Sequence, residues 1–347
     1  MGLVDSCVRA WTSFCNAAGR RTPAVLLLLA GVMVPGLARA EVSEVRLARQ
    51  YGISHLAMAI MDELQLVQKH AEQAGLGKVT VTWNRFSDGP GMNEALLSNN
   101  LDVANGGLTA LLVLWDKSRG AYVGLSALSS MPAVLMTRDP AIKSVADFKD
   151  TDRIALVSRV SMQAIILRML AADALGKDQA TRLDRLTVAM PHADAFAALQ
   201  SGKTEITAHF TAAPYYQQEE AAGLHRVLGS YGVLGGPATY SVAWTSKAFI
   251  DRNPKTARAI LDAMEEATSI IKGDPRRAAE LYIKADNSTL KPELVEAMIR
   301  DPENVFTTTP QNVMKFANFM ADTGTLKSRA SDWKEIFTPL IANRPGS

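Results

Sequence analysis

The sequence is poor in cysteine, and this shortage excludes several kinds of site. Only Cys7 and Cys15 occur among the 347 residues, and both precede a predicted cleavage point at Ala40. The chain after that point has no thiol, which excludes disulfides, a cysteine nucleophile and thiolate metal ligands. It also has no cysteine at the cleavage point, where a bacterial lipoprotein would carry its lipid.

The chain carries little excess charge of either sign. Its 37 Lys and Arg residues nearly balance 35 Asp and Glu residues, for a formal net charge of +2. Residues 1–40 hold four arginines and one aspartate, a net +3, so residues 41–347 sum to 33 − 34 = −1. Because nucleic-acid-binding proteins need a clustered basic surface, we expect no nucleic-acid partner.

Motifs that usually reveal an enzyme are missing as well. There is no G-x-x-x-x-G-K-[ST] phosphate loop and no G-x-S-x-G nucleophile motif. The five histidines do not fall at the i, i+2 or i, i+4 spacings of metal ligands. His192 and Asp194 flank Ala193, but two residues do not make a catalytic triad, and we interpret Asp194 as a helix cap. We therefore expect no catalytic residue, no metal site and no cofactor.

The first forty residues have the pattern of an export signal. Arg20 and Arg21 precede the apolar residues 23–37, and Ala38-Arg39-Ala40 places small residues where a signal peptidase cleaves. These fifteen residues are too few to cross about 30 Å of hydrocarbon, which disfavours the alternative of a membrane anchor. The paired arginines permit twin-arginine export, but the rest of that motif is absent. We predict a signal peptide at 1–40, cleavage near Ala40 and a periplasmic location.

After the leader, short β-rich runs alternate with amphipathic helices, which is typical of α/β architecture. A second series on the same plan begins at residue 154, and the chain beyond residue 245 is mainly helical. We therefore expect two doubly wound α/β lobes with a hinge between them, and extra C-terminal helices on the first lobe. The predicted strands are residues 45–50, 79–83, 101–105, 121–129, 133–137, 154–157, 186–189, 205–210 and 240–244.

Four segments in a fixed order resemble the periplasmic solute-binding proteins of ABC importers. The likeness is to the nitrate, sulfonate and taurine class, which is related to pyrimidine-precursor binders. It covers nearly all of residues 41–347 and implies the type II periplasmic-binding-protein fold. Lobe 1 would then consist of residues 41–137 and 245–347, and lobe 2 of residues 138–244. The segments that carry the likeness are residues 95–107, 144–157, 197–214 and 248–279.

The resemblance implies a receptor and not an enzyme. Such a protein, expected as a monomer, closes over a small and anionic organic solute, such as a sulfonate, taurine or nitrate. It then delivers the solute to an ABC permease and its ATPase. Glu205 stands where the family often has Asp, and His209-Phe-Thr-Ala-Ala-Pro214 replaces an aromatic-acidic-Pro element that faces the cleft in the family, so these departures bear on the solute and not on the fold. The alternatives are a pyrimidine-precursor binder, a pyrimidine-metabolism enzyme of the same fold and a sensory receptor.

Candidate contacts in the first lobe follow the predicted strand ends. In open α/β sheets ligands collect at the carboxyl ends of strands, where helix N-termini offer backbone N–H groups. Ser54 and His55 have an alternative interpretation, in which Ser54 caps a helix and His55 is solvated. The candidates in this lobe are Tyr51, Ser54, His55, Ser87, Asp88, Asn105, Gly106 and Ser130.

The second lobe offers an arginine as a possible anion contact. The guanidinium fork of Arg159 suits a sulfonate or carboxylate, but an exposed Arg159 with Ser161 as a helix cap is the alternative. By the resemblance, His209 and Thr211 lie in a cleft-facing loop. Tyr240 either stacks on a ring or fills the core. The remaining candidates are Ser158, Arg159, Ser161, His209, Thr211 and Tyr240.

Overall fold

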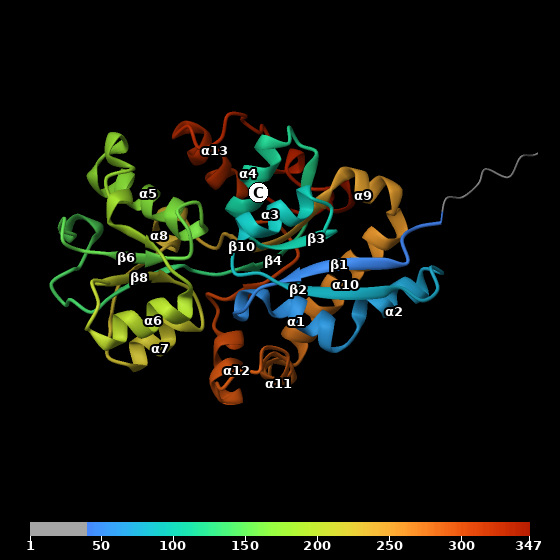
Figure 1. The fold of residues 1–347 in the computed structure, drawn as a ribbon, viewed down its shortest axis with the longest axis horizontal. Coiled ribbons are helices and arrows are strands. Elements are labelled where there is room, and N and C mark those ends of the chain that lie inside the picture. The colour runs from blue at the N-terminus through green and yellow to red at the C-terminus, as the bar shows by residue number, and fades with distance from the viewer. Residues whose placement is uncertain (1–39) are drawn as a thin grey trace, which may run out of the picture. The chain divides into compact units, whose positions relative to one another are not determined.

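The computed structural model describes residues 40–347, so the predicted signal peptide, apart from Ala40, lies outside the described residues. Glu41–Ser347 forms one compact unit built on two β-sheets (Figure 1). Within residues 40–347, no helix is both long enough and apolar enough to cross a membrane.

The first sheet has six strands in the order β11-β4-β10-β3-β1-β2. β1 pairs in parallel with β2 and β3, whereas β10 is antiparallel to both β3 and β4. The interior strand β1 buries Val45, Leu47 and Ala48, as its β-branched and aliphatic residues predict. The strands are β1 (Glu44–Arg49), β2 (Thr80–Arg85), β3 (Val103–Gly107), β4 (Tyr122–Ser130), β10 (Thr239–Ser246) and β11 (Val305–Phe306).

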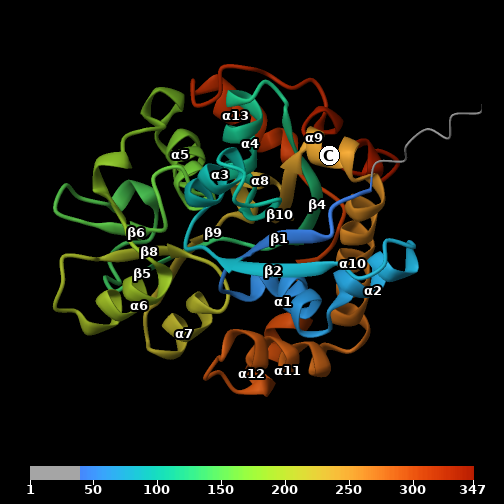
Figure 2. The same ribbon diagram turned by 45° about the vertical axis from the view of Figure 1, so that its right-hand side comes forward.

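Helices from both ends of the chain cover this sheet (Figure 2). α10 buries a face predicted by its apolar spacing, with Ile260, Leu261 and Met264 fully buried, and packs against α1 and α2. α11 in turn packs against α1 and α12, so the expected C-terminal helices on the first lobe are present. The helices are η1 (Ile53–His55), α1 (Leu56–Glu63), α2 (Leu66–Gln73), α3 (Gly89–Leu97), α4 (Leu108–Lys117), α9 (Lys247–Arg252), α10 (Pro254–Gly273), α11 (Pro275–Asp286), α12 (Pro292–Arg300), α13 (Val313–Asp322), η5 (Trp333–Glu335) and η6 (Pro339–Ile341).

The second sheet has five strands in the order β7-β6-β8-β5-β9. β6 pairs in parallel with β7 and β8, and β5 is antiparallel to β8 and β9. The strands are β5 (Val134–Thr137), β6 (Ile154–Leu156), β7 (Thr187–Ala189), β8 (Ala208–Thr211) and β9 (His225–Gly229). The helices are η2 (Val145–Asp147), α5 (Met162–Leu175), η3 (Lys177–Gln179), η4 (Asp184–Leu186), α6 (His192–Ser201), α7 (Tyr215–Ala221) and α8 (Tyr231–Leu234).

The two sheets divide the chain at places that differ from the expected lobe boundaries. β5, expected in the first lobe, is hydrogen-bonded between β8 and β9, while β10 lies in the first sheet although its residues up to 244 were expected in the second lobe. A strand belongs to the sheet that completes its backbone hydrogen bonds, which local sequence does not specify. We propose that each sheet marks one lobe, with the chain crossing between them at residues 131–133 and 230–238.

Three strands run further than the sequence indicates, and this moves several candidate residues. β3 continues past the predicted end at residue 105 through Gly106 and Gly107, which pair with Val242 and Ser241 of β10. β4 continues to Ser130. β8 extends to Thr211. His209, which the predicted strand 205–210 already contained, and Thr211 therefore both lie in a strand, and not in the cleft-facing loop that the resemblance implied.

Candidate functional site

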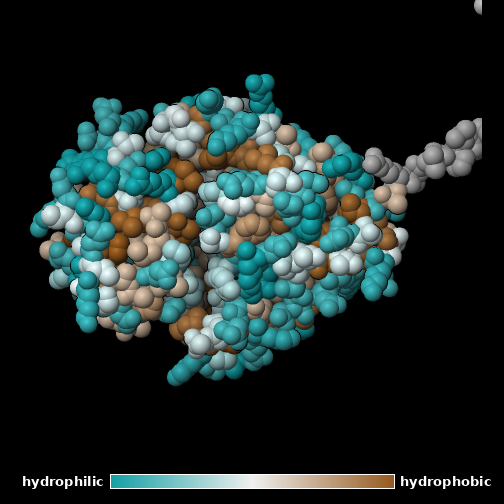
Figure 3. Space-filling model, in the orientation of Figure 1, coloured by the Kyte–Doolittle hydropathy of each residue, from teal (hydrophilic) through white to brown (hydrophobic). Residues whose placement is uncertain are grey.

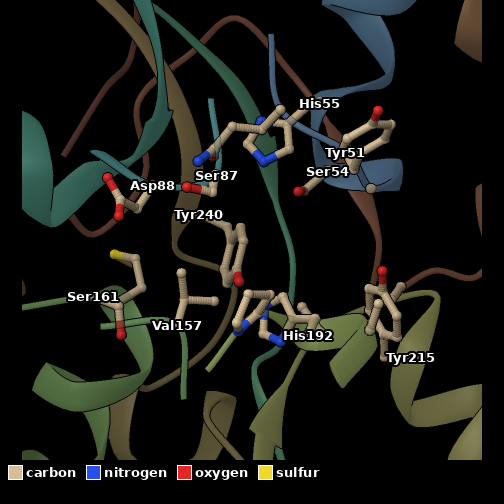
Figure 4. Close-up of a pocket in the computed structure, with 18 of the residues that line it drawn as sticks. Tyr51, Ser54, His55, Ser87, Asp88, Val157, Ser161, His192, Tyr215 and Tyr240 are labelled. Atoms are coloured by element: carbon tan, nitrogen blue, oxygen red, sulfur yellow. The ribbon is translucent and has the colours of Figure 1, made fainter. Parts of the chain in front are cut away.

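A cavity of about 540 Å³ lies where strand ends of the two sheets meet. The first lobe contributes the segments after β1 and β2, and the second lobe contributes those after β6, β7 and β8. Figure 4 shows Tyr51, Ser54 and His55 on one side of this space, and Val157, Ser161, His192 and Tyr215 on the other. The position at strand ends agrees with the rule for ligand sites in open α/β sheets.

Most of the candidate contacts line this cavity. They come from the loops after β1 and β2, from the segment before α5 and from β10. Their contact with a solute stays a prediction, since the structure shows only their position. The candidates on the cavity wall are Tyr51, Ser54, His55, Ser87, Asp88, Ser158, Ser161 and Tyr240.

The other candidates do not line the cavity. Asn105, Gly106 and Ser130 lie inside β3 and β4 and are buried in the first lobe, because those strands are longer than expected. His209 and Thr211 are fully buried in β8, behind the cavity wall.

Arg159 is exposed and is absent from the cavity wall, although Ser158 and Val160 on either side of it line the cavity. Ser161 caps α5 by accepting a hydrogen bond from the Ala164 backbone N–H. The structure therefore has the alternative arrangement, in which Arg159 is a surface residue and Ser161 a helix cap.

Two other interpretations of helix caps are wrong. Ser54 lies inside the short helix η1, and its side chain caps neither η1 nor α1. His55 is 6% exposed and therefore not solvated. α6 begins at His192 with Pro191 in the cap position, so Asp194 falls in the first helical turn. α6 thus starts before Asp194, and η1, which precedes α1, already contains Ser54.

Exposed hydrophobic side chains lie on both edges of the cavity. Tyr51 of the first lobe is 61% exposed and Val160 of the second is 40% exposed, and both line the cavity. Figure 3 shows a furrow between the two sides of the molecule on one face, with brown, hydrophobic residues along its left side and at its upper end. A solute that covered Tyr51 and Val160 would remove apolar surface from water, which stabilises a closed complex.

The loop after β2 is fixed by a helix cap and a close helix contact. The carboxylate of Asp88 accepts a hydrogen bond of 2.9 Å from the Gly91 N–H and caps α3. A Cβ added at Gly89 would lie 2.4 Å from the Cβ of Ala110 on α4. Gly89 thus allows α3 to approach α4 closely.

An ion-pair cluster that sequence reasoning missed supports another part of the wall. Asp286, at the end of α11, lines the cavity and is paired with Arg49 at 2.7 Å and with Arg85 at 3.2 Å. Arg49 also pairs with Asp62 at 2.6 Å. The Arg85 guanidinium carbon lies 4.3 Å from the ring centre of Tyr51, a cation–π contact. Asp286 follows Arg85 by 201 positions, so no local signal links the two.

Two histidines on the wall are held in the neutral form. Burial lowers the pKa of His55 to about 4, and its Nδ1 lies 3.0 Å from the Ser241 hydroxyl. Burial, and then the neighbouring His209, lowers the pKa of His192. Gln163 lies between His192 and Tyr240 and donates a hydrogen bond of 2.7 Å to the Tyr240 hydroxyl oxygen.

The cavity therefore offers hydrogen bonds and aromatic faces, and little charge. Among residues 40–347, no Lys or Arg lines it, and its charged side chains are Asp88 and Asp286. In the same part of the chain no group of three or more His, Cys, Asp or Glu residues is placed to hold a metal ion. The aromatic residues on the wall are Tyr51, Phe86, Tyr215, Tyr240 and Tyr282, apart from the two histidines.

The sequence of residues 38–283 matches the model of the NMT1-like family. The chain belongs to the NMT1-like family. No curated protein matches this chain in sequence.

Solved structures with the same fold include periplasmic binding proteins. The alkanesulfonate-binding protein SsuA from Xanthomonas axonopodis pv. citri, bound to MOPS, is 16% identical with a TM-score of 0.68, over 84% of this chain and 96% of that one. The aliphatic sulphonate binding protein SsuA from Escherichia coli is 19% identical with a TM-score of 0.66, over 86% and 93%. The nitrate-binding protein NrtA from Synechocystis PCC 6803 is 16% identical with a TM-score of 0.64, over 85% of each chain. The expected periplasmic-binding-protein fold is confirmed.

Proposed function

We propose that this NMT1-like protein is an exported solute-binding protein that delivers a small organic solute to an ABC permease. The observation that carries the proposal is a cavity of about 540 Å³ built from strand ends of both sheets. The solute is captured and released without chemical change. Family membership and the shared fold with sulfonate- and nitrate-binding proteins support this role.

Binding is coupled to closure of the two lobes. Contacts to the first lobe at Tyr51 and to the second lobe at Val160 and His192 are made together only when the lobes are close. The solute therefore shifts an equilibrium between open and closed forms toward the closed form. The permease recognises that closed form, and the protein acts as a monomer in the periplasm.

The wall of the cavity favours a ring-bearing solute without a strong negative charge. An anionic solute such as a sulfonate, taurine or nitrate was expected to bind Arg159, which is exposed and away from the wall. The two carboxylates on the wall, Asp88 and Asp286, oppose an anion, although Arg49 and Arg85 compensate Asp286. Five aromatic side chains offer faces for stacking. We therefore propose a pyrimidine precursor or a similar flat, polar ring.

A thermal-shift panel of pyrimidines, alkanesulfonates, taurine, nitrate and aromatic carboxylates tests both the role and the solute class. We expect a pyrimidine to raise the melting temperature, because a ligand at a hundred times its Kd adds about 2.7 kcal/mol of stability. Arg159→Ala is the control and should not change that shift. A larger shift with a sulfonate that Arg159→Ala removes would show that the solute class is wrong.

Recovery of the bound solute separates a receptor from an enzyme. Mass spectrometry of the solute after prolonged incubation with the protein should find it unchanged. A product of altered mass would contradict the receptor and favour a pyrimidine-metabolism enzyme of the same fold. Binding to a purified permease in membranes, and not to a signalling protein, distinguishes transport from sensing.

A further inference from the structure

Three titratable side chains form a row that runs from the interior of the second lobe to the cavity. Glu219 Oε1 lies 2.5 Å from His209 Nδ1, and His209 Nε2 lies 2.8 Å from His192 Nδ1. Glu219 and His209 are fully buried, whereas His192 lines the cavity. The three residues, here called the Glu–His–His row, come from α7, β8 and the start of α6.

Little around the row competes for its protons. Glu219 Oε2 is buried and has no hydrogen-bond partner among residues 40–347. The strand neighbours of His209 are Met136 on β5 and Ala155 on β6, whose side chains do not titrate. An unpaired carboxylate oxygen in such a place is costly, which favours a row that keeps a proton.

The other titratable groups close to the row are few, and those on β9, which packs against α7, are the exposed His225 and Arg226. Glu220 follows Glu219 on α7 and is exposed, and Asp194 lies on the first turn of α6. Tyr215 packs its ring 5.3 Å from that of His192, centre to centre. His55 faces His192 from the first lobe and is itself kept neutral by burial. The Thr211 hydroxyl lies 3.4 Å from His192 Nδ1 and does not titrate in the physiological range.

The two hydrogen bonds of the row determine where its protons lie. Each bond needs one hydrogen between its two heavy atoms. With an ionised Glu219 and two neutral imidazoles, both hydrogens occupy these bonds, and His192 Nε2 has a bare lone pair. One additional proton on the row leaves two hydrogens in the bonds and a third on His192 Nε2. This holds when the carboxyl is neutral with its proton on Oε1, toward His209, or when the charge is on His192, whereas a proton on the unpartnered Oε2 would leave His192 Nε2 bare.

The group that meets His192 Nε2 is compatible with both states. Gln163 Nε2 lies 3.3 Å from His192 Nε2 in the arrangement described. A side-chain amide has a donor end and an acceptor end, and the two are exchanged by a half-turn of the amide. Gln163 therefore does not fix the state of His192, and the proton on the row does.

We propose that His192 presents a hydrogen-bond donor to the solute when the row holds the additional proton, and an acceptor when it does not. Glu219 binds the proton, and His209 transmits the change by exchanging its N–H from one ring nitrogen to the other. The role of His192 toward the solute rests on the proposed function, whereas the titration of the row does not. The protonated row selects a solute with a carbonyl oxygen or a ring nitrogen at this point.

The environment of the row places the change near neutral pH. Burial, and then Glu220, raises the pKa of Glu219 to about 8. Burial lowers the pKa of His209 to about 3, so the additional proton is held by the carboxyl and not by that imidazole. His192 therefore presents a donor below about pH 8 and an acceptor above it.

Proton NMR correlated to ¹⁵N in the full chain, labelled at histidine, tests the row without any solute. We expect His192 Nε2 to carry a hydrogen at lower pH and to lose it as the pH rises through about 8. Glu219→Gln should abolish this transition, because an amide does not titrate. The matched control Glu220→Gln, exposed on the same helix, should move it by less than about half a pH unit.

A His192 Nε2 that stays in one state through this pH range, or an unchanged transition in Glu219→Gln, overturns the proposal. The wild-type titration decides the matter even where Glu219→Gln fails to fold. Because no solute is added, a negative result here leaves the proposed solute-binding role in place. A failed solute panel, in turn, does not alter the expected titration.

Discussion

At the scale of the residue, Glu219 is a carboxyl group whose surroundings oppose its charge. Its side chain is fully buried, and one of its oxygens has no hydrogen-bond partner within the described part of the chain. The folded protein therefore holds a proton on Glu219 at pH values where the unfolded chain has released it. The sequence around Glu219 shows none of this, since Glu219 and Glu220 are adjacent and only one is buried.

This difference makes stability depend on pH. The pKa of Glu219 is raised to about 8 in the folded protein. The contribution of Glu219 to the free energy of unfolding is therefore complete below the pKa of this carboxyl in the unfolded chain, and it is lost as the pH rises toward 8. Between about pH 6.5 and 8 the histidines of the unfolded chain are mostly neutral, so Glu219 makes the largest contribution to the pH dependence of the free energy of unfolding. The free energy of unfolding should fall by up to about 1.4 kcal/mol per pH unit in wild type relative to Glu219→Gln.

Urea unfolding at the two ends of this pH range measures the effect. Glu220→Gln is the control and should follow the wild type. Parallel pH profiles for the wild type and Glu219→Gln would contradict a raised pKa at Glu219. Below pH 6.5 the buried histidines give the opposite pH dependence of the free energy of unfolding. The pKa of His209 is lowered in the folded protein, so the fold loses stability as the pH falls and His209 in the unfolded chain gains a proton.

At the scale of the element, strand ends and helix contacts decide which side chains reach the cavity. The loop after β2 reaches the wall because α3 lies against α4 at Gly89. The extra residues of β3 and β4 withdraw Asn105 and Ser130 from the site. Both effects come from backbone pairing and packing between elements that are distant in the sequence.

Gly89→Ala tests the contact between α3 and α4. Its Cβ would lie 2.4 Å from that of Ala110, and overpacking of this kind costs about 1–3 kcal/mol. Ala110→Gly alone costs about 1 kcal/mol, as glycine does inside a helix. We expect the double variant to lose less stability than the sum of the losses of the two single variants.

The free energies of unfolding of these three variants, measured in urea, form a double-mutant cycle. Additive effects within about 0.5 kcal/mol would show that Gly89 does not need the space occupied by Ala110. The same variants report on the site, because the loop that follows β2 lines the cavity.

At the scale of the whole molecule, two sheets linked by two crossings both contribute to the wall of the cavity. The crossings at residues 131–133 and 230–238 connect the sheets, and no covalent link other than the backbone is available, since the chain beyond Cys15 has no thiol. Relative motion of the lobes is then opposed mainly by non-covalent contacts. In the proposed function, the solute adds contacts to both lobes and favours the closed form.

Small-angle X-ray scattering measures this closure. The radius of gyration should decrease when a solute that raises the melting temperature is added. Tyr51→Ala should lower the affinity for that solute about tenfold or more, because an exposed aromatic face on one edge of the cavity is lost. A radius of gyration that does not change at saturation would contradict a closing receptor. Arg159→Ala again serves as the control.

Local patterns in the sequence predicted most of the elements. Alternation and β-branching located strands such as β2, and the stretch predicted as mainly helical beyond residue 245 contains α10, whose apolar residues form its buried face. These features depend on neighbours within a few residues, so they can be read from the chain itself. The boundaries were less accurate where hydrogen bonds to a distant strand extended β3 and β8.

The sequence by itself determined the alternation of strands and helices, the near-neutral charge and the absence of thiols after Ala40. Only the tertiary structure decided that Arg159 is exposed and absent from the cavity wall and that His192 lines the cavity. It also brought Glu219, His209 and His192 into one row from three elements. The physical reason is that burial and the pairing of polar groups depend on residues far apart in the chain, whereas secondary structure depends largely on near neighbours.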